Sequence, residues 1–225
     1  NSGNKYEGEM AGGKRTGYGK FTFADGDYYE GYFVNNLWAG KGVFNSETSG
    51  VTREGNWGNG ELQGKGKVIY ASGNVYEGYF INGEPSGKGK ATWTNGNIYE
   101  GDWIDNKRTG KGKFTWVNGD VYEGDWINDA RTGKGKFTWT SGNIYEGDWI
   151  DGNRTGNGKI TWADGAVCVG NFVDGKQEGY CETIYAKTDE KGRKSFKGYW
   201  KDGKRNGKGK MIYWDGRTEK GKFID

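Results

Sequence analysis

Hydrophobic and polar positions alternate over short stretches of this chain, and the same alternation returns about every 23 residues. In residues 99–103, tyrosine, glycine and tryptophan share one face, while Glu100 and Asp102 share the other. In residues 110–116, glycine and aromatic residues alternate in the same way with lysine and threonine. Period-2 alternation predicts two short β-strands per repeat, and the glycine density argues against helix.

The repeat runs through nearly the whole chain. Each copy opens with Tyr-Glu-Gly or a degenerate form of it, at Tyr6, Tyr29, Arg53, Tyr76, Tyr99, Tyr122, Tyr145, Cys168, Phe196 and Glu219. We therefore expect one array over residues 1–225, with nine full units and the first strand of a tenth. One unit, around residues 168–195, is irregular and carries a charged insert, which predicts a longer solvated hairpin or a partner-docking loop.

Charge matching suggests a register for each hairpin. We expect the strands on either side of residues 104–109 to pair antiparallel, because this register satisfies both faces. The predicted partners are Trp103 with Gly110, Gly101 with Gly112, Tyr99 with Phe114, Glu100 with Lys113, and Asp102 with Lys111. The aromatic rings would then lie on bare glycine backbone.

The units themselves are joined by Asn-Gly, Asp-Gly or Ser-Gly, which are strong hairpin signals. A two-residue loop would invert the aromatic face of the next strand. We therefore expect a three-residue loop, Val117-Asn118-Gly119, closed by a glycine bulge. The predicted fold is all-β, an elongated and curved single-layer solenoid of antiparallel hairpins.

Composition narrows the function. The chain has 45 glycines and 1 proline, but 11 Trp, 15 Tyr and 10 Phe argue against disorder. A net charge of +3 is too small to indicate a nucleic-acid-binding protein. Two cysteines, Cys168 and Cys181, are too few for a disulfide framework, so we expect free thiols and a reducing, cytoplasmic compartment. Because the sequence begins with Asn1, we interpret it as a fragment or a processed chain.

The sequence offers little catalytic chemistry. Without histidine, Ser-His and Cys-His nucleophiles are excluded. The repeated carboxylates each face a lysine, so a charge ladder is favoured over acid–base catalysis. Cys168 and Cys181 lack further ligands for a metal, and no phosphate-binding loop motif occurs. We therefore expect no enzyme activity, no cofactor and no metal.

The repeated Tyr-Glu-Gly-Asp-Trp, Gly-Lys-Gly-Lys-Phe-Thr-Trp and Asn-Gly-Asp-Val-Tyr-Glu-Gly segments resemble MORN (membrane occupation and recognition nexus) repeats. The resemblance extends from Tyr6 to Phe223. One departure is Thr109, and its copies, where many members of the family have histidine. The resemblance implies a solenoid that acts as a binding or scaffolding module, in some members at membranes and in others through a segment gripped in the concave groove.

We therefore predict a non-catalytic scaffold, an adaptor or tether that binds a protein segment along its concave face. The predicted partner-binding residues are the aromatic rows Tyr76, Tyr99, Trp103, Tyr122, Trp126, Tyr145 and Trp149. An alternative is that these rings pack only on each other and on glycine.

Two other functions stay open. The chain is alternatively a peripheral binder of anionic phospholipid membrane, or a regulatory arm of an enzyme whose catalytic domain lies outside this sequence. The lipid-binding residues would be the lysine rows Lys88, Lys90, Lys111, Lys113, Lys134 and Lys136. Neighbouring carboxylates equally allow a merely solvated face. An open sheet end near Lys222 offers pairing with a second copy as a homodimer. Peripheral membrane or cytoskeletal association is the alternative to a purely cytoplasmic location.

Overall fold

The computed structural model describes residues 3–225, which form strands and turns only. The chain divides into two compact units, one extending to Gly110 and one formed by Lys111–Asp225. The first unit contains β1 (Lys5–Ala11), β2 (Lys14–Thr22), β3 (Tyr28–Val34), β4 (Leu37–Ser46), β5 (Val51–Gly58), β6 (Glu61–Ile69), β7 (Val75–Ile81), β8 (Glu84–Thr92) and β9 (Ile98–Ile104).

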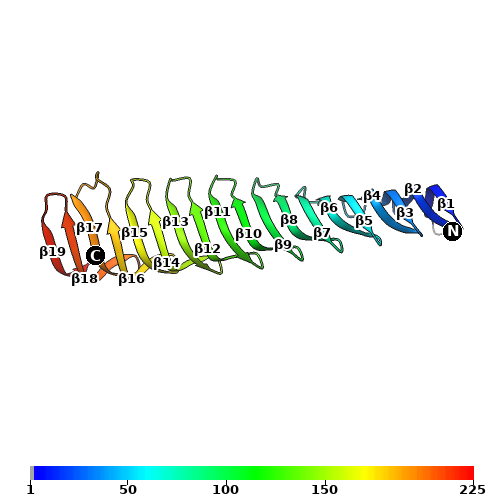
Figure 1. The fold of residues 1–225 in the computed structure, drawn as a ribbon. Coiled ribbons are helices and arrows are strands. Elements are labelled where there is room, and N and C mark those ends of the chain that lie inside the picture. Colours follow the sequence, from blue (N-terminus) through cyan, green and yellow to red (C-terminus); the bar gives the residue numbers. More distant parts are fainter. Residues whose placement is uncertain (1–2) are drawn as a thin grey trace. The chain divides into compact units, whose positions relative to one another are not determined.

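The second unit repeats this arrangement. It contains β11 (Val121–Ile127), β12 (Ala130–Thr138), β13 (Ile144–Ile150), β14 (Asn153–Thr161), β15 (Val167–Val173), β16 (Lys176–Ile184), β17 (Arg193–Lys201), β18 (Lys204–Tyr213) and β19 (Thr218–Ile224). Strand β10 (Lys107–Thr115) includes the boundary. Within each unit, consecutive strands are antiparallel neighbours in a single layer (Figure 1). The predicted all-β solenoid of hairpins is confirmed.

The part of the hairpin that lies farther from its two-residue turn has the predicted register. In the hairpin of β11 and β12, Tyr122 lies opposite Phe137 and Gly124 lies opposite Gly135. These are the copies, one repeat later, of the predicted Tyr99–Phe114 and Gly101–Gly112 pairs. The side chains that the sequence places on one face therefore do share it.

The second half of the hairpin differs from the prediction. A β-bulge follows Gly124, and Trp126 pairs with Arg131 instead of with Gly133. Gly133 has a left-handed φ of 68°, which is favourable for glycine and helps β12 to accommodate its two extra residues. The predicted pairing occurs between repeats instead, because Gly133 lies opposite Trp149 of the next strand pair.

The turn within each hairpin is shorter than expected. Strands β11 and β12 are joined by Asn128-Asp129 alone, with φ values of 47° and 70°. Two consecutive positive φ values are typical of a type I′ turn, which suits strand twist. The loop predicted over residues 104–109 is therefore too long in this copy of the unit, since most of the corresponding residues belong to strands.

The connection between repeats agrees with the prediction. Trp116 N donates to the Asp120 carbonyl over 2.9 Å, and Gly119 N donates to the Trp116 carbonyl over 2.9 Å. These bonds close the three-residue loop 117–119, in which Gly119 has a φ of 89°. The aromatic face consequently stays on the same side from one repeat to the next.

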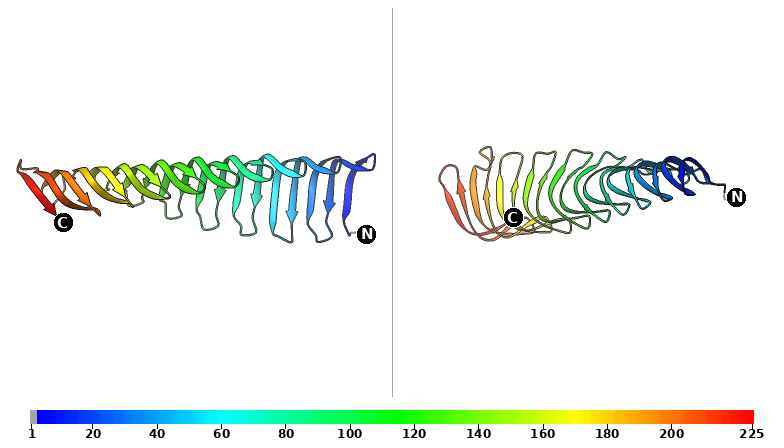
Figure 2. Two further views of the ribbon diagram at one scale, coloured as in Figure 1. Left: turned by 90° about the horizontal axis from the view of Figure 1, so that it is seen from below. Right: turned by 45° about the vertical axis from the view of Figure 1, so that its right-hand side comes forward.

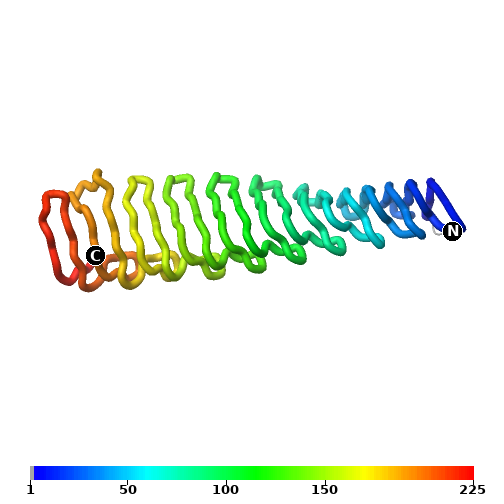
Figure 3. The backbone as a smooth tube through the Cα atoms, in the orientation of Figure 1, coloured from blue at the N-terminus to red at the C-terminus, as the bar shows by residue number. Residues whose placement is uncertain are grey.

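The hydrophobic core lies on the aromatic–glycine face, which we call the inner face. A single layer has no second sheet to cover it, and the strands within each unit are strongly bent (Figures 2 and 3). Because the aromatic side chains are the buried ones, the strands bend toward the inner face. The opposite, outer face carries the lysines and carboxylates, and most of them are exposed.

Candidate functional site

The predicted partner-binding aromatics form the core. None of Tyr76, Tyr99, Trp103, Tyr122, Trp126, Tyr145 and Trp149 is more than 6 % exposed. These seven rings therefore pack on each other and on glycine, which is the alternative that the sequence left open, and partner binding through them stays a prediction. A partner on the inner face would meet the residues that cover these rings.

Tyr122 shows how the rings are held. Its ring lies edge-on to Trp126 and to Trp149 of the next repeat, with centroids 5.3 and 5.1 Å apart. Its hydroxyl donates to the Asp125 carbonyl over 3.0 Å. A Cβ placed on Gly135 would come within 2.4 Å of that hydroxyl, so the ring lies on bare backbone as predicted. Burial raises the pKa of Tyr122 above its usual value.

The indole N–H groups link one repeat to the preceding one. Trp149 Nε1 donates to the Gly135 carbonyl over 3.1 Å, and Trp126 Nε1 donates to the Gly112 carbonyl over 3.2 Å. The corresponding bond in the first unit joins Trp103 to Gly89 over 3.3 Å. Buried tryptophan therefore satisfies its donor in each of these regular repeats.

The six candidate lipid-binding lysines lie on the outer face, and each forms an ion pair across neighbouring repeats. The pairs are Lys88–Asp102 (2.7 Å), Lys90–Glu100 (2.8 Å), Lys111–Asp125 (2.5 Å), Lys113–Glu123 (3.3 Å), Lys134–Asp148 (2.5 Å) and Lys136–Glu146 (3.8 Å). The lysine rows are thus interleaved with carboxylate rows of equal charge. Their binding to lipid stays a prediction.

Arginine and tryptophan line a hollow on the inner face of the second unit, which we call the groove. A pocket of about 280 Å³ in the second unit is bordered by Arg131, Trp139, Trp149 and Arg154, among others. The Arg131 guanidinium lies 4.8 Å from the ring centre of Trp149, and that of Arg154 lies 5.2 Å from that of Trp139. These distances are typical of cation–π contacts.

Hydrogen bonds hold the arginines in place. Arg131 Nη2 donates to the Gly152 carbonyl over 2.8 Å, and Arg154 Nη2 donates to the Gly175 carbonyl over 2.7 Å. Each acceptor belongs to the two-residue turn of the next repeat, so the arginines also bridge repeats. Burial lowers the pKa of Arg154 from its usual value.

These arginines are functional candidates that the sequence reasoning missed. The loop predicted over residues 104–109 includes Arg108, so the prediction places neither Arg108 nor its copies on a face of the sheet. The signal was present in the recurring Arg-Thr-Gly of residues 108–110, 131–133 and 154–156. With strands extended up to the two-residue turns, alternation places these arginines on the inner face.

The irregular repeat changes the groove. Cys168, Gln177, Cys181 and Thr183 occupy the positions that Tyr122, Arg131, Gly135 and Phe137 hold in the repeat two copies earlier. Both cysteines are free and fully buried. A hydrogen bond from Cys181 lowers the pKa of Cys168, whereas the same bond and burial raise the pKa of Cys181.

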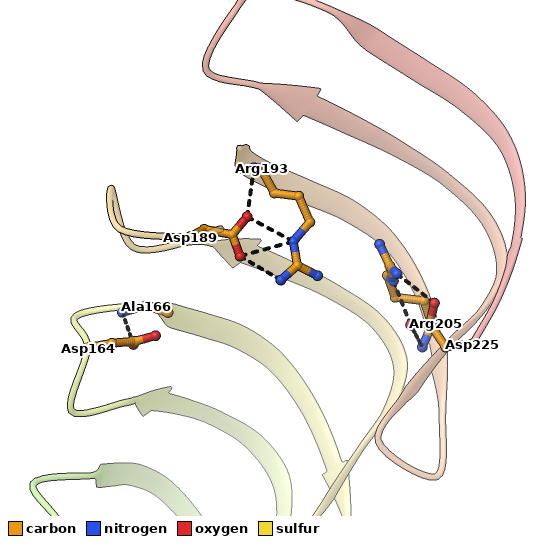
Figure 4. Close-up of polar contacts among 6 residues, drawn as sticks. All are labelled: Asp164, Ala166, Asp189, Arg193, Arg205 and Asp225. Carbon is orange, nitrogen blue, oxygen red and sulfur yellow. Dashed lines mark hydrogen bonds and ion pairs between the residues drawn. The ribbon is translucent and has the colours of Figure 1, made fainter. Parts of the chain in front are cut away.

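The insert after β16 is held by an ion pair that Figure 4 shows. Asp189 accepts hydrogen bonds from the backbone N–H of Arg193 over 2.8 Å and from its Nη2 over 2.6 Å. The Arg193 guanidinium holds the pKa of Asp189 below its usual value and lies 4.2 Å from the ring centre of Tyr185. The loop is therefore a closed, hydrogen-bonded structure.

A second pair closes the same end of the groove. Arg205 donates through Nε and Nη2 to the two carboxylate oxygens of Asp225, both over 2.6 Å (Figure 4). The guanidinium lowers the pKa of Asp225. A pocket of about 390 Å³ lies beside both pairs, with walls that include Trp162, Thr183, Tyr185 and Trp200.

Across residues 3–225, no three His, Cys, Asp or Glu side chains come together as metal ligands. The described chain likewise contains no helix of the length and apolarity needed to cross a bilayer.

Solved structures with similar strand ladders include TCP domains of CPAP and SAS-4. The TCP10 domain of Danio rerio CPAP, in complex with a peptide of STIL, is 11% identical over 92% of this chain and 84% of that chain, with a TM-score of 0.43. The TCP domain of Drosophila melanogaster SAS-4, in complex with a proline-rich motif of Ana2, is 10% identical over 98% and 90%, with a TM-score of 0.38. Scores this low carry no inference about function.

The family model of the MORN repeat matches nine consecutive segments. They are residues 6–28, 29–50, 54–75, 76–98, 99–121, 122–144, 145–167, 168–189 and 196–216. The irregular repeat is among them, so its cysteines are variations within the same unit, whereas residues 190–195 of the insert lie between two matched segments. The chain belongs to the MORN repeat family.

Proposed function

We propose that the chain is a non-catalytic scaffold that binds an extended protein segment along the inner-face groove. The observation that carries the proposal is the pairing of arginine with tryptophan along the groove of the second unit, at Arg131, Trp139 and Arg154. Tryptophan and arginine are the residues enriched at interface hot spots.

The groove offers a partner hydrogen-bond donors that are already held in position, and apolar surface beside them. A guanidinium carries five N–H donors, so the single bond from Arg154 to Gly175 leaves donors for a partner's carbonyl or carboxylate. Cation–π contact and the turn carbonyl hold Arg154 in position before a partner arrives, which reduces the entropy lost on binding. Trp139 supplies half-buried apolar area beside it.

Site-specific crosslinking tests this proposal. p-Benzoylphenylalanine replaces Trp139 in the groove or, as the matched aromatic control, Tyr180, which is exposed on the outer face. The chain is irradiated in extract of its native source, and crosslinked peptides are sequenced by mass spectrometry. We expect a specific protein segment to be crosslinked at position 139, and Arg154→Ala to abolish that product. Equal or preferential crosslinking at position 180 would refute groove binding.

Variants of the lysine rows and of the groove distinguish membrane binding from groove binding. The ion-paired lysine rows present as many carboxylates as ammonium groups, which weakens attraction to anionic lipid. Co-sedimentation with phosphatidylserine vesicles that is lost on Lys134→Gln and Lys136→Gln, but not on Arg154→Ala, would favour membrane attachment.

A further inference from the structure

On the outer face of the regular repeats, a Lys-Gly-Lys triplet in one strand lies opposite an acidic triplet in the next strand. Lys134 lies opposite Asp148 and Lys136 lies opposite Glu146, and both are ion pairs. The chain therefore contains its own complement to Lys-Gly-Lys. That complement is two carboxylates at positions i and i+2 of an extended segment, which place both on one face.

The last two strands, β18 and β19, lack this complement. Strand β18 carries another Lys-Gly-Lys triplet, but β19 also carries Lys-Gly-Lys in the place of the acidic triplet. Lys208 therefore lies opposite Lys222, and Lys210 lies opposite Lys220 (Figure 1). We call these four residues the lysine cluster. Like charges directly opposite each other destabilise a sheet, so a bound anion would stabilise this part of the array.

The positive charge of the lysine cluster is accessible and unbalanced. All four side chains are exposed, and none of them forms an ion pair with any of residues 3–225. Their side chains, together with Gly209 and Gly221, border a hollow of about 420 Å³. Each of the six candidate lipid-binding lysines, by contrast, is neutralised by a carboxylate.

The excess charge is confined to β18 and β19. On the neighbouring strand, Lys197 lies opposite Lys210, but it forms an ion pair with Glu182 over 2.6 Å. Residues directly opposite have Cβ atoms about 5 Å apart, and residues i and i+2 of a strand lie about 7 Å apart. The four lysines thus surround a small rectangle, whereas a membrane or a nucleic acid presents charge over a much larger surface.

The dimensions of the rectangle indicate the partner. The two lysine pairs are separated along the strands by the distance between side chains i and i+2 of an extended chain. We propose that the lysine cluster binds an acidic protein segment in extended conformation, with carboxylates at positions i and i+2, one above each lysine pair. The segment supplies from outside the acidic triplet that β19 lacks. This site lies on the outer face and is separate from the inner-face groove.

Two peptides of equal composition test the proposal on the intact chain. One fluorescein-labelled octapeptide alternates glutamate with threonine, so its carboxylates recur at i and i+2. In the other, pairs of glutamates alternate with pairs of threonines, and this spacing does not occur. Fluorescence anisotropy at low ionic strength measures both affinities. We expect the alternating peptide to bind about three- to tenfold more tightly, as two additional matched charge pairs predict.

Matched variants locate the charge that binds. Lys220→Gln with Lys222→Gln removes two charges from the lysine cluster, and Lys134→Gln with Lys136→Gln removes two from an ion-paired row. The first double variant should weaken the alternating peptide at least about tenfold and the second less than about twofold, because lysines already paired with carboxylates attract it little. ¹⁵N-edited NMR should show the amide resonances of Gly209 and Gly221 shifting with the peptide, while that of Gly147 stays in place.

A third double variant separates binding from folding. Lys220→Glu with Lys222→Asp restores the acidic triplet of the regular repeats. It should abolish peptide binding and at the same time raise Tm, because each lysine of β18 then lies opposite a carboxylate. Loss of binding in a more stable chain cannot result from a failure to fold.

Several results would overturn the proposal. Equal affinity for the two peptides would refute the i and i+2 geometry, and equal weakening by the two glutamine double variants would refute the location. Binding of phosphatidylserine vesicles through the lysine cluster, with no binding of either peptide, would assign the site to a membrane instead. Arg154→Ala leaves the lysine cluster intact, so it should abolish crosslinking at position 139 without changing peptide binding. The two sites therefore stand or fall separately.

Discussion

The packing of rings on glycine makes a sharp prediction at Gly147, in strand β13. A Cβ at this position would lie 2.6 Å from the carbonyl oxygen of Asn157, 2.6 Å from Cα of Gly158 and 2.6 Å from the hydroxyl of Tyr145. Two of these neighbours are backbone atoms of the adjacent strand and cannot rotate away. The backbone of Gly147 is not left-handed, so Gly147→Ala tests space alone.

The expected cost follows from these contacts. Overpacking of a well-packed core costs about 1–3 kcal/mol. Moving the ring of Tyr145 also endangers the bond from its hydroxyl to the Asp148 carbonyl, 3.1 Å long, which contributes about 1 kcal/mol. We therefore expect Gly147→Ala to lower the free energy of unfolding by about 2–4 kcal/mol, equivalent to roughly 5–15 °C in Tm for a chain of this size.

Gly221 in β19 provides the matched control, since it also ends a Glu-Lys-Gly version of the repeat triplet. A Cβ on Gly221 would meet no atom within 4 Å among the described residues. Gly221→Ala should therefore change Tm by no more than a few degrees. Thermal unfolding followed by circular dichroism measures both, and hydrogen exchange of β13 and β14 amides reports local opening, since repeat arrays need not unfold in one step. Equal stability of the two variants would refute the account of ring packing.

Three further predictions concern buried and exposed groups. Burial raises the pKa of Tyr145 to about 12, so the contribution of its neutral side chain to stability is complete below pH 10 and is lost as pH rises toward 12. In urea unfolding, the free energy of unfolding should therefore fall less between pH 10 and pH 12 for Tyr145→Phe than for the unchanged chain. Cys168 and Cys181 are fully buried, so Ellman's reagent should react slowly with native protein and with two thiols after denaturation, and fast native reaction would contradict their burial. In urea unfolding, Arg154→Ala should lower the free energy of unfolding by about 1.5–3 kcal/mol, because it removes a charged hydrogen bond. Lys134→Gln should lower it by under about 1 kcal/mol, because the ion pair it removes is exposed. A larger loss for Lys134→Gln than for Arg154→Ala would contradict the assignment of inner and outer faces.

Much of the fold could be predicted because its information is local. The strands follow from period-2 alternation within seven to nine residues, and the loop 117–119 follows from its Asn-Gly signal and the need to keep faces in phase. Gly124 and Gly135 lie opposite each other as predicted, because the glycine column and the aromatic column fix each other's register.

The rest depends on long-range geometry. Nothing within one repeat says that strands bend until Tyr122 and Trp126 are closed off from solvent, so the sequence alone leaves open whether these rings contact a partner or pack only on each other and on glycine. The bulge after Gly124 was missed for a related reason: charge matching favoured a register that does occur, but between repeats. Charge complementarity alone does not distinguish the two interfaces of a strand, whereas the two-residue turns at Asp151-Gly152 and Asp174-Gly175 do.

An array of similar repeats offers a bound segment more than one position, and an irregular repeat can distinguish these positions. The repeats that begin at Tyr122 and Tyr145 share the arginine and the tryptophan that line the groove, so a segment bound to these side chains alone would have almost equal affinity after sliding by one repeat. A preference of about tenfold for one register needs only about 1.4 kcal/mol. The repeat that begins at Cys168 has Gln177 and Thr183 in place of Arg131 and Phe137, and the loss of one charged hydrogen bond to a partner there is an effect of this size. Regular repeats then provide the binding surface, and the irregular one determines where along it the partner is placed.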